Sequence, residues 1–288
     1  MPALTCTLIQ TKLYWEDKAA NLAMLHDKIM GIKEKTEIVI LPEVFSTGFS
    51  MKPELFAETM HGHTVTWMEK TAAKKRVILT GSLIIEEGGK YYNRLIWMLP
   101  NGEYGYYDKR HLFAYGHEDE HYTAGNKRLI ACVKGFKLNL QVCYDLRFPV
   151  WARQQAPAIS QNNLLDKNAP PPLREERGIR GEANLEYDIL LYVANWPERR
   201  TYAWKALLQA RAIENQCYVI GVNRVGNDGN NIYHSGNSTV IDPMGDILYE
   251  RLHEEDIFTI TLQTDRLEEV RNKFPFWKDG DKFTITHE

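Results

Sequence analysis

Residues 140–149 read LQVCYDLRFP, and this stretch decides how the rest of the chain is interpreted. An apolar strand runs into Cys143, and a turn with polar residues follows directly. A cysteine at such a point lies on a tight bend at the end of a rigid strand, where a second molecule can approach its sulfur. We therefore expect Cys143 to be chemically available at the edge of a sheet.

Two further segments place polar side chains directly after an apolar strand. Residues 41–45 read LPEVF and contain Glu43, and residues 107–113 read YDKRHLF and contain Lys109. A cysteine nucleophile needs a base, a donor for the developing oxyanion and an acid for the leaving group. Glu43 is a candidate for base and acid, and Lys109 is a candidate for the cation. A buried cysteine at a strand end is often only structural, so the spacing by itself leaves both interpretations open.

Outward from these segments, short apolar strands alternate with amphipathic helices. The pattern predicts helices over residues 17–35, about 65–72 and 201–215. It predicts strands over residues 4–9, 37–41, 76–85, 91–99, 104–107, 137–143, 189–194, 218–223, 238–241 and 247–250. Glycine-rich turns join several neighbouring strands, so the fold is expected to be mixed α/β with much antiparallel sheet.

Composition excludes several classes of protein. The 288 residues are 44% hydrophobic and 25% charged, which is typical of a folded domain. With 35 Lys and Arg against 38 Asp and Glu, the net charge of −3 argues against nucleic acid or an anionic membrane as the main partner. The apolar runs are far shorter than the roughly 20 residues that span a bilayer. We see no signal peptide and expect a cytoplasmic protein.

The remaining cysteines and a group of histidines favour no metal site. Cys6, Cys132 and Cys217 lie in apolar, strand-like text and are predicted to be small buried hydrophobes. Three histidines lie near the lysine segment: His111, His117 and His121. No metal-ligand spacing recurs among them, so we expect solvated or locally hydrogen-bonded side chains.

Taken together and in this order, the segments around Glu43, Lys109 and Cys143 resemble the three signature segments of the nitrilase (carbon–nitrogen hydrolase) superfamily. The resemblance continues in residues 92–94 (YNR), 210–216 (ARAIENQ), 236–245 (GNSTVIDPMG), 192–197 (YVANWP) and 273–279 (KFPFWKD). The last two segments are similar to those of the bacterial ω-amidases within that superfamily.

This resemblance implies a four-layer α-β-β-α sandwich formed by one domain over residues 1–288. It also implies a Glu-Lys-Cys triad at Glu43, Lys109 and Cys143. In the superfamily a second glutamate precedes a glycine in the loop after the lysine. Spacing to the glycine at position 125 favours Glu118 for that role, with Glu120 as the fallback.

The resemblance further implies an amidase that hydrolyses the terminal amide of small 2-oxo dicarboxylic acid monoamides, such as 2-oxoglutaramate or 2-oxosuccinamate. The acyl group would pass through a thioester, with the Tyr144 backbone N–H and the lysine stabilising the oxyanion. No metal or organic cofactor is implied, and the protein is expected to form a homodimer or a higher homo-oligomer.

Three residues are candidates for the substrate pocket. Arg147 either meets a substrate carboxylate or pairs with Asp145 within its own turn. Asn195 and Trp196 follow a predicted strand and are expected to line the pocket, although Trp196 also suits an ordinary core.

Two other functions remain as alternatives. One is another amidase of the superfamily or an N-carbamoyl-amine hydrolase, which would release carbon dioxide as well as ammonia. The other is a non-catalytic binding protein on the same fold, although such a protein would not need all three triad residues.

Residues 154–186 lack the alternation of apolar strands and amphipathic helices that is predicted for the rest of the chain. They combine several prolines and amides with mixed charges and show almost no apolar periodicity. Loops of this length are usually functional or disordered. We interpret the segment as an insertion that is a surface loop, a lid over the pocket or an added contact in an oligomer.

Overall fold

The strands form two mixed sheets, which the computed structural model describes for residues 2–155 and 185–286. The first sheet has the order β13 (Asp256–Gln263), β1 (Ala3–Gln10), β2 (Ile38–Ile40), β3 (Ile78–Glu87), β4 (Lys90–Met98) and β5 (Tyr104–Asp108). The second has the order β10 (Val225–Asn227), β11 (Tyr233–Ile241), β9 (Tyr218–Asn223), β8 (Ile189–Ala194), β7 (Phe136–Val142) and β6 (Leu129–Val133), and β12 (Ile247–Leu252) pairs with β11. Strands β1, β2 and β3 are parallel to one another, as are β7, β8 and β9.

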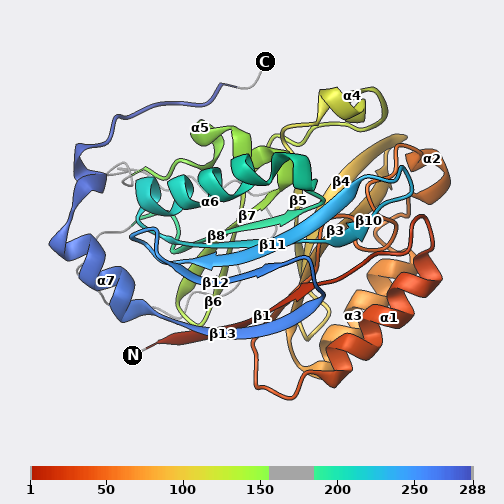
Figure 1. The fold of residues 1–288 in the computed structure, drawn as a ribbon, viewed down its shortest axis with the longest axis horizontal. Helices are drawn as coiled ribbons and strands as arrows, with labels where there is room; N and C mark the ends of the chain where they lie inside the picture. Colours follow the sequence, from red (N-terminus) through yellow and green to blue (C-terminus); the bar gives the residue numbers. More distant parts are fainter. Residues whose placement is uncertain (1, 156–184, 287–288) are drawn as a thin grey trace.

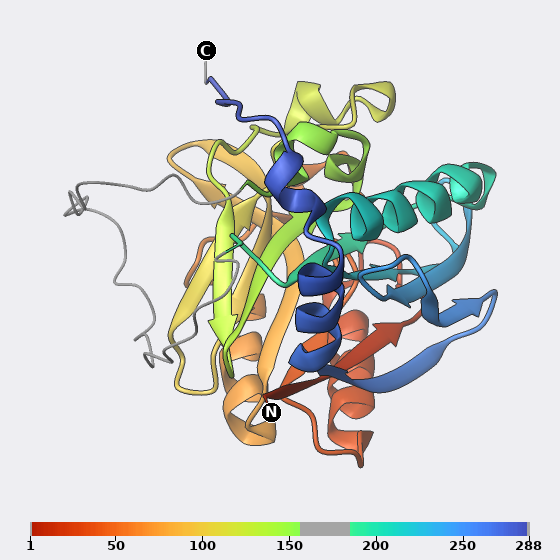
Figure 2. The same ribbon diagram turned by 90° about the vertical axis from the view of Figure 1, so that its left-hand side faces the viewer.

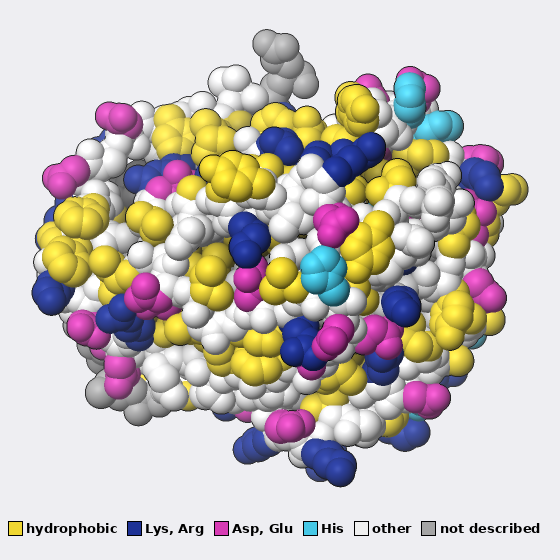
Figure 3. Space-filling view, viewed as in Figure 1, with side chains coloured by type: hydrophobic (Ala, Val, Ile, Leu, Met, Phe, Trp, Pro, Cys, Tyr) yellow, Lys and Arg dark blue, Asp and Glu magenta, His cyan; other side chains and the backbone are white. Residues whose placement is uncertain are grey.

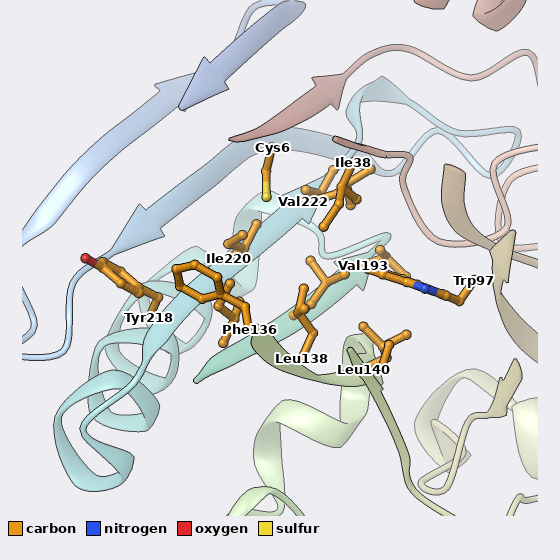
Figure 4. Close-up of a cluster of buried hydrophobic side chains, with 14 of the residues drawn as sticks. Cys6, Ile38, Trp97, Phe136, Leu138, Leu140, Val193, Tyr218, Ile220 and Val222 are labelled. Carbon is orange, nitrogen blue, oxygen red and sulfur yellow. The ribbon is translucent and has the colours of Figure 1, made fainter. Parts of the chain in front are cut away.

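The main core lies between the two sheets. Successive side chains of a strand point to opposite faces, so every second residue of the central strands reaches this layer. The first sheet contributes Leu4, Cys6, Leu8, Ile38 and Ile40, and the second contributes Leu138, Leu140, Ile189, Leu191, Val193, Ile220 and Val222. Figure 4 shows Cys6, Ile38 and Trp97 facing Leu138, Val193 and Val222 across this layer.

Helices cover the outer face of each sheet. Helices α1 (Lys18–Gly31) and α3 (His63–Lys75) pack on the first sheet, and α6 (Thr201–Asn215) packs on the second. The alternate side chains of the same strands meet them: Val39 of β2 faces α1 and α3, while Leu190 and Tyr192 of β8 face α6. Both ribbon views show the sheets between the α1–α3 pair and α6 (Figures 1 and 2). The predicted four-layer α-β-β-α sandwich is confirmed. Strands buried on both faces also explain why these runs are apolar throughout.

Several short elements complete the fold. They are α2 (Pro53–Phe56), α4 (Glu118–His121), α5 (Pro149–Ala152), α7 (Thr264–Lys273) and the 3₁₀ turns η1 (Ala114–Gly116), η2 (Cys143–Arg147), η3 (Glu198–Arg200) and η4 (Phe276–Asp279). Within the described ranges no helix has both the length and the apolar character needed to cross a bilayer.

Helix α1 begins where the sequence predicts but ends earlier. The Asp17 side chain accepts the Ala20 N–H at 3.0 Å and caps the first turn. The helix stops at Gly31, not at residue 35: Ile32 is already extended, and Lys75 of α3 donates its ammonium to the Met30 carbonyl at 3.4 Å and to the Ile32 carbonyl at 2.6 Å. This tertiary contact satisfies a carbonyl of the last turn and releases the chain toward β2.

The prediction that Cys132 is buried is wrong. Cys6 and Cys217 are buried, but Cys132 is exposed. Strand β6 forms the edge of the second sheet, and its side chains alternate between the core, which Ala131 enters, and the surface. Edge position, which apolar text alone does not reveal, accounts for the difference.

The predicted insertion at residues 154–186 lies almost wholly outside the described residues. The described residues at its two ends meet one another: the Gln154 backbone N–H donates to the Asn215 side chain at 3.1 Å, and the Tyr187 N–H donates to the Gln154 side chain at 3.4 Å. Helix α6 therefore anchors the point where the chain leaves the sandwich and the point where it returns.

Because these ends are already held together, we expect that residues 156–184 can be replaced by a short Gly-Ser linker. The variant should keep kcat/KM within about threefold of the wild-type value. A linker about one quarter as long as the replaced segment should raise the free energy of unfolding by about 1 kcal/mol, because a shorter loop loses less entropy on closure. The amide hydrolysis that the resemblance implies measures the first effect, and urea unfolding measures the second. A large loss of kcat/KM with normal folding would contradict this expectation and favour a lid or an oligomer contact.

Candidate active site

Four strands end at one edge of the sandwich, and each delivers a polar residue there. Glu43 follows β2, Lys109 follows β5, Cys143 follows β7 and Asn195 follows β8. Parallel strands present their carboxyl ends at the same edge, which is where open α/β sheets bind ligands. The topology thus brings the three triad candidates together from both sheets.

Lys109 lies between two carboxylates. Its ammonium nitrogen is 3.1 Å from Glu43 Oε1 and 2.9 and 2.8 Å from the two oxygens of Glu118. All three side chains are buried. Burial opposes the charge on the amine, but Glu118 and then Glu43 outweigh it and raise the pKa of Lys109 above its ordinary value. Lys109 is therefore a permanent cation.

Glu118, not Glu120, is the second carboxylate that contacts Lys109. Its Oε2 also accepts the Phe113 N–H at 2.6 Å, whereas Glu120 is exposed and contacts His117. Burial raises the pKa of Glu118, with Lys109 acting in the opposite direction. Gly125 closes the loop: its N–H donates to the Lys109 carbonyl at 2.9 Å, and a Cβ there would lie 2.1 Å from the Asp108 carbonyl oxygen.

Glu43 is held by three further donors. Asn93 Nδ2 donates to Oε1 at 2.8 Å, and the Asn195 backbone N–H donates to Oε2 at 2.7 Å. The Asn195 side-chain amide donates to the Glu43 carbonyl at 2.6 Å. Both carboxylate oxygens are therefore fixed before any substrate arrives.

Cys143 stands on a strained turn. Its φ is +46°, a left-handed conformation that non-glycine residues rarely adopt, at the start of η2. Burial and then Glu43 raise the pKa of the thiol well above its ordinary value, with Lys109 opposing them. The resting arrangement is thus a neutral thiol beside a fixed carboxylate.

A cavity of about 210 Å³ opens onto this cluster. Its floor holds Glu43, Lys109 and Cys143, and its walls include Phe49, Met51, Phe113, Tyr115, Tyr144, Trp196, Ile232 and His234. This volume lies below the usual range for ligand pockets, so the cavity suits a small molecule.

Three arginines, Arg147, Arg199 and Arg200, also line the cavity. Arg147 lies over the Trp196 ring at 5.2 Å and Arg200 over the Phe113 ring at 4.8 Å. Burial and then Arg199 lower the pKa of Arg200. Among the described residues none of the three has a carboxylate partner. In the space-filling view basic side chains gather between α6 and α4 (Figure 3).

The structure excludes one of the two interpretations of Arg147. Asp145 accepts hydrogen bonds from Val142, Tyr107 and His111, and Arg147 is not among its partners. Arg147 instead reaches the cavity. The interpretation in which it pairs with Asp145 is wrong, because other donors fill that carboxylate.

The other predicted pocket residues also lie at the cavity. Tyr144 forms part of its wall, with its ring edge-on to Phe113 at 5.0 Å. Trp196 serves both predicted roles: it lines the cavity, and it packs in the α6 core at 5.5 Å from Trp204. Asn195 also lines the cavity, but its backbone N–H and side-chain amide hold Glu43.

Sequence reasoning missed two residues of the site. Asn93 appears inside an apolar strand, and Arg200 appears in a charged run after Pro197. A buried asparagine in the middle of β4 was the available signal for the first. For the second, the available signal was a pair of arginines a few residues after the predicted strand 189–194 and Trp196.

Comparisons with known proteins find similarity along nearly the whole chain. The family model described as "Carbon-nitrogen hydrolase" matches residues 5–161 and 178–272. The chain is 39% identical to the omega-amidase YafV of Escherichia coli K12 over 99% of this chain and 100% of that protein. It is 28% identical to the 2-oxoglutaramate amidase of Bacillus subtilis, with 96% of each chain covered.

Among solved structures, the fold is similar to that of XC1258 from Xanthomonas campestris, a CN-hydrolase superfamily protein with an arsenic adduct in its active site. The TM-score is 0.88 at 40% identity, and the match covers 99% of this chain and 100% of that one. A nitrilase superfamily member from yeast, Nit3, shares the fold with a TM-score of 0.77 at 24% identity, covering 95% of each chain.

Proposed function

Because the chain belongs to the carbon–nitrogen hydrolase family, we propose that it hydrolyses the terminal amide of small 2-oxo dicarboxylic acid monoamides, such as 2-oxoglutaramate and 2-oxosuccinamate. The observation that carries the proposal is the small cavity, which has the Glu43–Lys109–Cys143 cluster at its floor and, in its wall, three arginines with no carboxylate partner in the described part of the chain. The similarity to the omega-amidase YafV and to a 2-oxoglutaramate amidase supports the same substrate class.

In the first half of the proposed reaction, Cys143 attacks the amide carbonyl as its proton passes to Glu43. The new S–C bond makes a tetrahedral oxyanion. Lys109 and the Tyr144 backbone N–H stabilise it, because an N–H in the first turn of a helix has no partner within that helix. The proton on Glu43 then moves to the leaving nitrogen, the C–N bond breaks, and ammonia departs from a thioester on Cys143.

In the second half, water attacks the thioester. Glu43, a carboxylate again, takes a proton from the water, and the same two donors hold the second oxyanion. The S–C bond breaks, the proton returns to the sulfur, and the carboxylic acid leaves. Glu118 does not touch the reacting atoms in this scheme. Its carboxylate keeps Lys109 charged and oriented.

The arginines give the proposed substrate its orientation. A terminal amide at Cys143 places the other end of a four- or five-carbon chain within the same small cavity. The carboxylate at that end would meet Arg200, which is half-buried, with Arg147 closer to the mouth. A guanidinium matches a carboxylate with two parallel hydrogen bonds.

Arg200→Gln should therefore weaken use of carboxylate-bearing amides selectively. Loss of a hydrogen bond to a charged group predicts a fall of about 10- to 100-fold in kcat/KM for 2-oxoglutaramate. A neutral amide of similar length should keep its kcat/KM within about threefold of the wild-type value. Steady-state ammonia release measures both, with Arg251→Gln on strand β12, outside the cavity lining, as the matched control. Equal losses on both substrates would contradict the assigned role.

The proposed function is tested by ammonia release from 2-oxoglutaramate, 2-oxosuccinamate, glutamine, asparagine and an N-carbamoyl amine. We expect the two oxo-amides to give much the highest kcat/KM. Release of carbon dioxide together with ammonia from the carbamoyl compound, at a higher kcat/KM, would instead indicate a carbamoyl-amine hydrolase. Failure of every amide tested would overturn the enzymatic proposal.

A further inference from the structure

The Asp145 carboxylate lies two residues after Cys143 and is wholly buried. Its Oδ2 accepts the Val142 backbone N–H at 3.0 Å and the Tyr107 hydroxyl at 2.8 Å. Its Oδ1 accepts the His111 backbone N–H at 2.9 Å and lies 2.8 Å from His111 Nδ1. The carboxylate therefore contacts four donor positions from two separate segments.

Two of these partners flank the lysine of the site. Tyr107 and His111 lie two residues before and two residues after Lys109, at the end of β5 in the first sheet. Asp145 belongs to η2, which follows β7 in the second sheet. Contacts between these partners therefore join the segment that carries the lysine to the turn that carries the cysteine.

Further contacts hold Tyr107, His111 and the η2 turn in place. The Tyr107 hydroxyl also accepts the Arg110 N–H at 3.1 Å and Trp151 Nε1 at 2.9 Å. The His111 ring stacks on Phe148, with ring centroids 3.8 Å apart. From the opposite side, Arg211 of α6 donates to the Leu146 carbonyl of η2 at 2.7 Å. Each of these groups therefore has little freedom to move alone.

The strained backbone at Cys143 needs such support. A left-handed non-glycine residue persists only where the surrounding structure holds it. The bond from the Val142 N–H to Asp145 fixes the peptide unit directly before Cys143. The same carboxylate thus holds the strained turn and its distance from the lysine.

We propose that Asp145 is a positioning residue that sets the Cys143 sulfur relative to the Lys109 ammonium across the two sheets. The proposal rests on the proposed roles of Cys143 and Lys109. An aspartate that only stabilised its own turn would need donors from that turn alone. Asp145 instead takes donors from the lysine segment of the other sheet. The control is Asp242, a buried aspartate outside the cavity lining: its Oδ1 accepts the N–H groups of Met244 and Asp246 within the β11–β12 turn, and its Oδ2 pairs with Arg266 of α7.

The test compares Asp145→Asn with Asp242→Asn as the matched buried control. In Asp145→Asn an NH₂ group faces N–H or O–H donors, whichever way the amide is turned. We expect kcat per titrated active site to fall by about 10- to 100-fold and KM to stay within about twofold, because the reacting groups are misplaced but the pocket remains. Asp242→Asn should lower the unfolding midpoint without changing kcat per site.

A second readout does not depend on amide hydrolysis. The rate of Cys143 alkylation by iodoacetamide, followed by peptide mapping, should fall at least about tenfold in Asp145→Asn, because Glu43 accepts the proton of the neutral thiol as the sulfur attacks and a displaced sulfur loses that base. Tyr107→Phe removes one of the four donors and should give a smaller decrease. Because the two residues share one contact, the double variant should be less impaired than the product of the two single effects predicts.

The outcomes separate the two proposals. Wild-type kcat per site and wild-type alkylation in folded Asp145→Asn would overturn the positioning role, as would equal effects from Asp242→Asn. If the wild-type protein hydrolyses no amide, the proposed function fails. The alkylation rates of wild type and Asp145→Asn would then still decide whether Asp145 positions the cysteine.

Discussion

Cys143→Ala is expected to lower kcat/KM for amide hydrolysis by about 10⁴-fold or more, because removal of a nucleophile leaves only binding and oxyanion stabilisation. Ammonia release measures the effect. The variant should fold normally, since the side chain is only partly buried and loses a single sulfur.

Cys132→Ala is the matched control, because Cys132 is exposed on β6, at the edge strand of the second sheet. We expect this variant to keep wild-type kcat/KM. A Cys143→Ala variant that retained more than a few per cent of the activity would show that the sulfur is not the attacking group.

Lys109→Met is expected to abolish activity and also to destabilise the fold. The substitution leaves Glu43 and Glu118 buried without their shared cation, and loss of one partner from a buried pair costs about 3–5 kcal/mol. Urea unfolding measures this cost. Replacing Glu118 with Gln in the same chain removes one of the two uncompensated charges, so the double variant should unfold at higher urea than Lys109→Met alone.

The pH dependence of Lys109→Met follows from the same charges. Burial raises the pKa of Glu118 and Lys109 opposes this rise, so removal of the lysine raises the pKa further. A carboxyl group whose pKa is raised by folding binds its proton more tightly in the folded state, so its folded state gains stability as the pH falls. The variant should therefore recover free energy of unfolding as the pH falls toward the ordinary glutamate pKa of about 4.3. A variant as stable as wild type at every pH above that value would contradict the buried ion cluster.

The sequence was sufficient for the elements whose local signals agree with their packing. Helix α6 spans Thr201–Asn215 as predicted, and strand β9 spans Tyr218–Asn223 as predicted. The apolar stripe of α6 identifies its buried face, and the continuous apolar run of β9 identifies a strand buried on both faces. Helix α1 ends early, where a lysine from α3 binds the Met30 and Ile32 carbonyls, and the contact with Ile32 joins residues 43 positions apart. Strand β13 was missed. Its pairing with β1 joins opposite ends of the chain, and several of its side chains are partly exposed.

The candidate site shows the same difference between local signals and long-range contacts. Glu43, Lys109 and Cys143 were candidates because each follows a strand and their chemistries complement one another, but the resemblance to the superfamily, not the spacing, assigned them to one triad. Asn93 was missed because its contact with Glu43 spans 50 residues. Arg200 was missed because a charged run usually indicates a solvated surface, and only the fold shows that its guanidinium lines the cavity.

The most direct test of the central claim is the partition of the acyl group between water and hydroxylamine. A thioester on Cys143 is the same species whatever group has left, so the amide and the methyl ester of 2-oxoglutaric acid must give the same ratio of hydroxamate to acid at each hydroxylamine concentration. We predict one common ratio for both donors, and no hydroxamate from Cys143→Ala. A ratio that depends on the leaving group, or hydrolysis without any hydroxamate, would contradict a shared thioester and the account built on it.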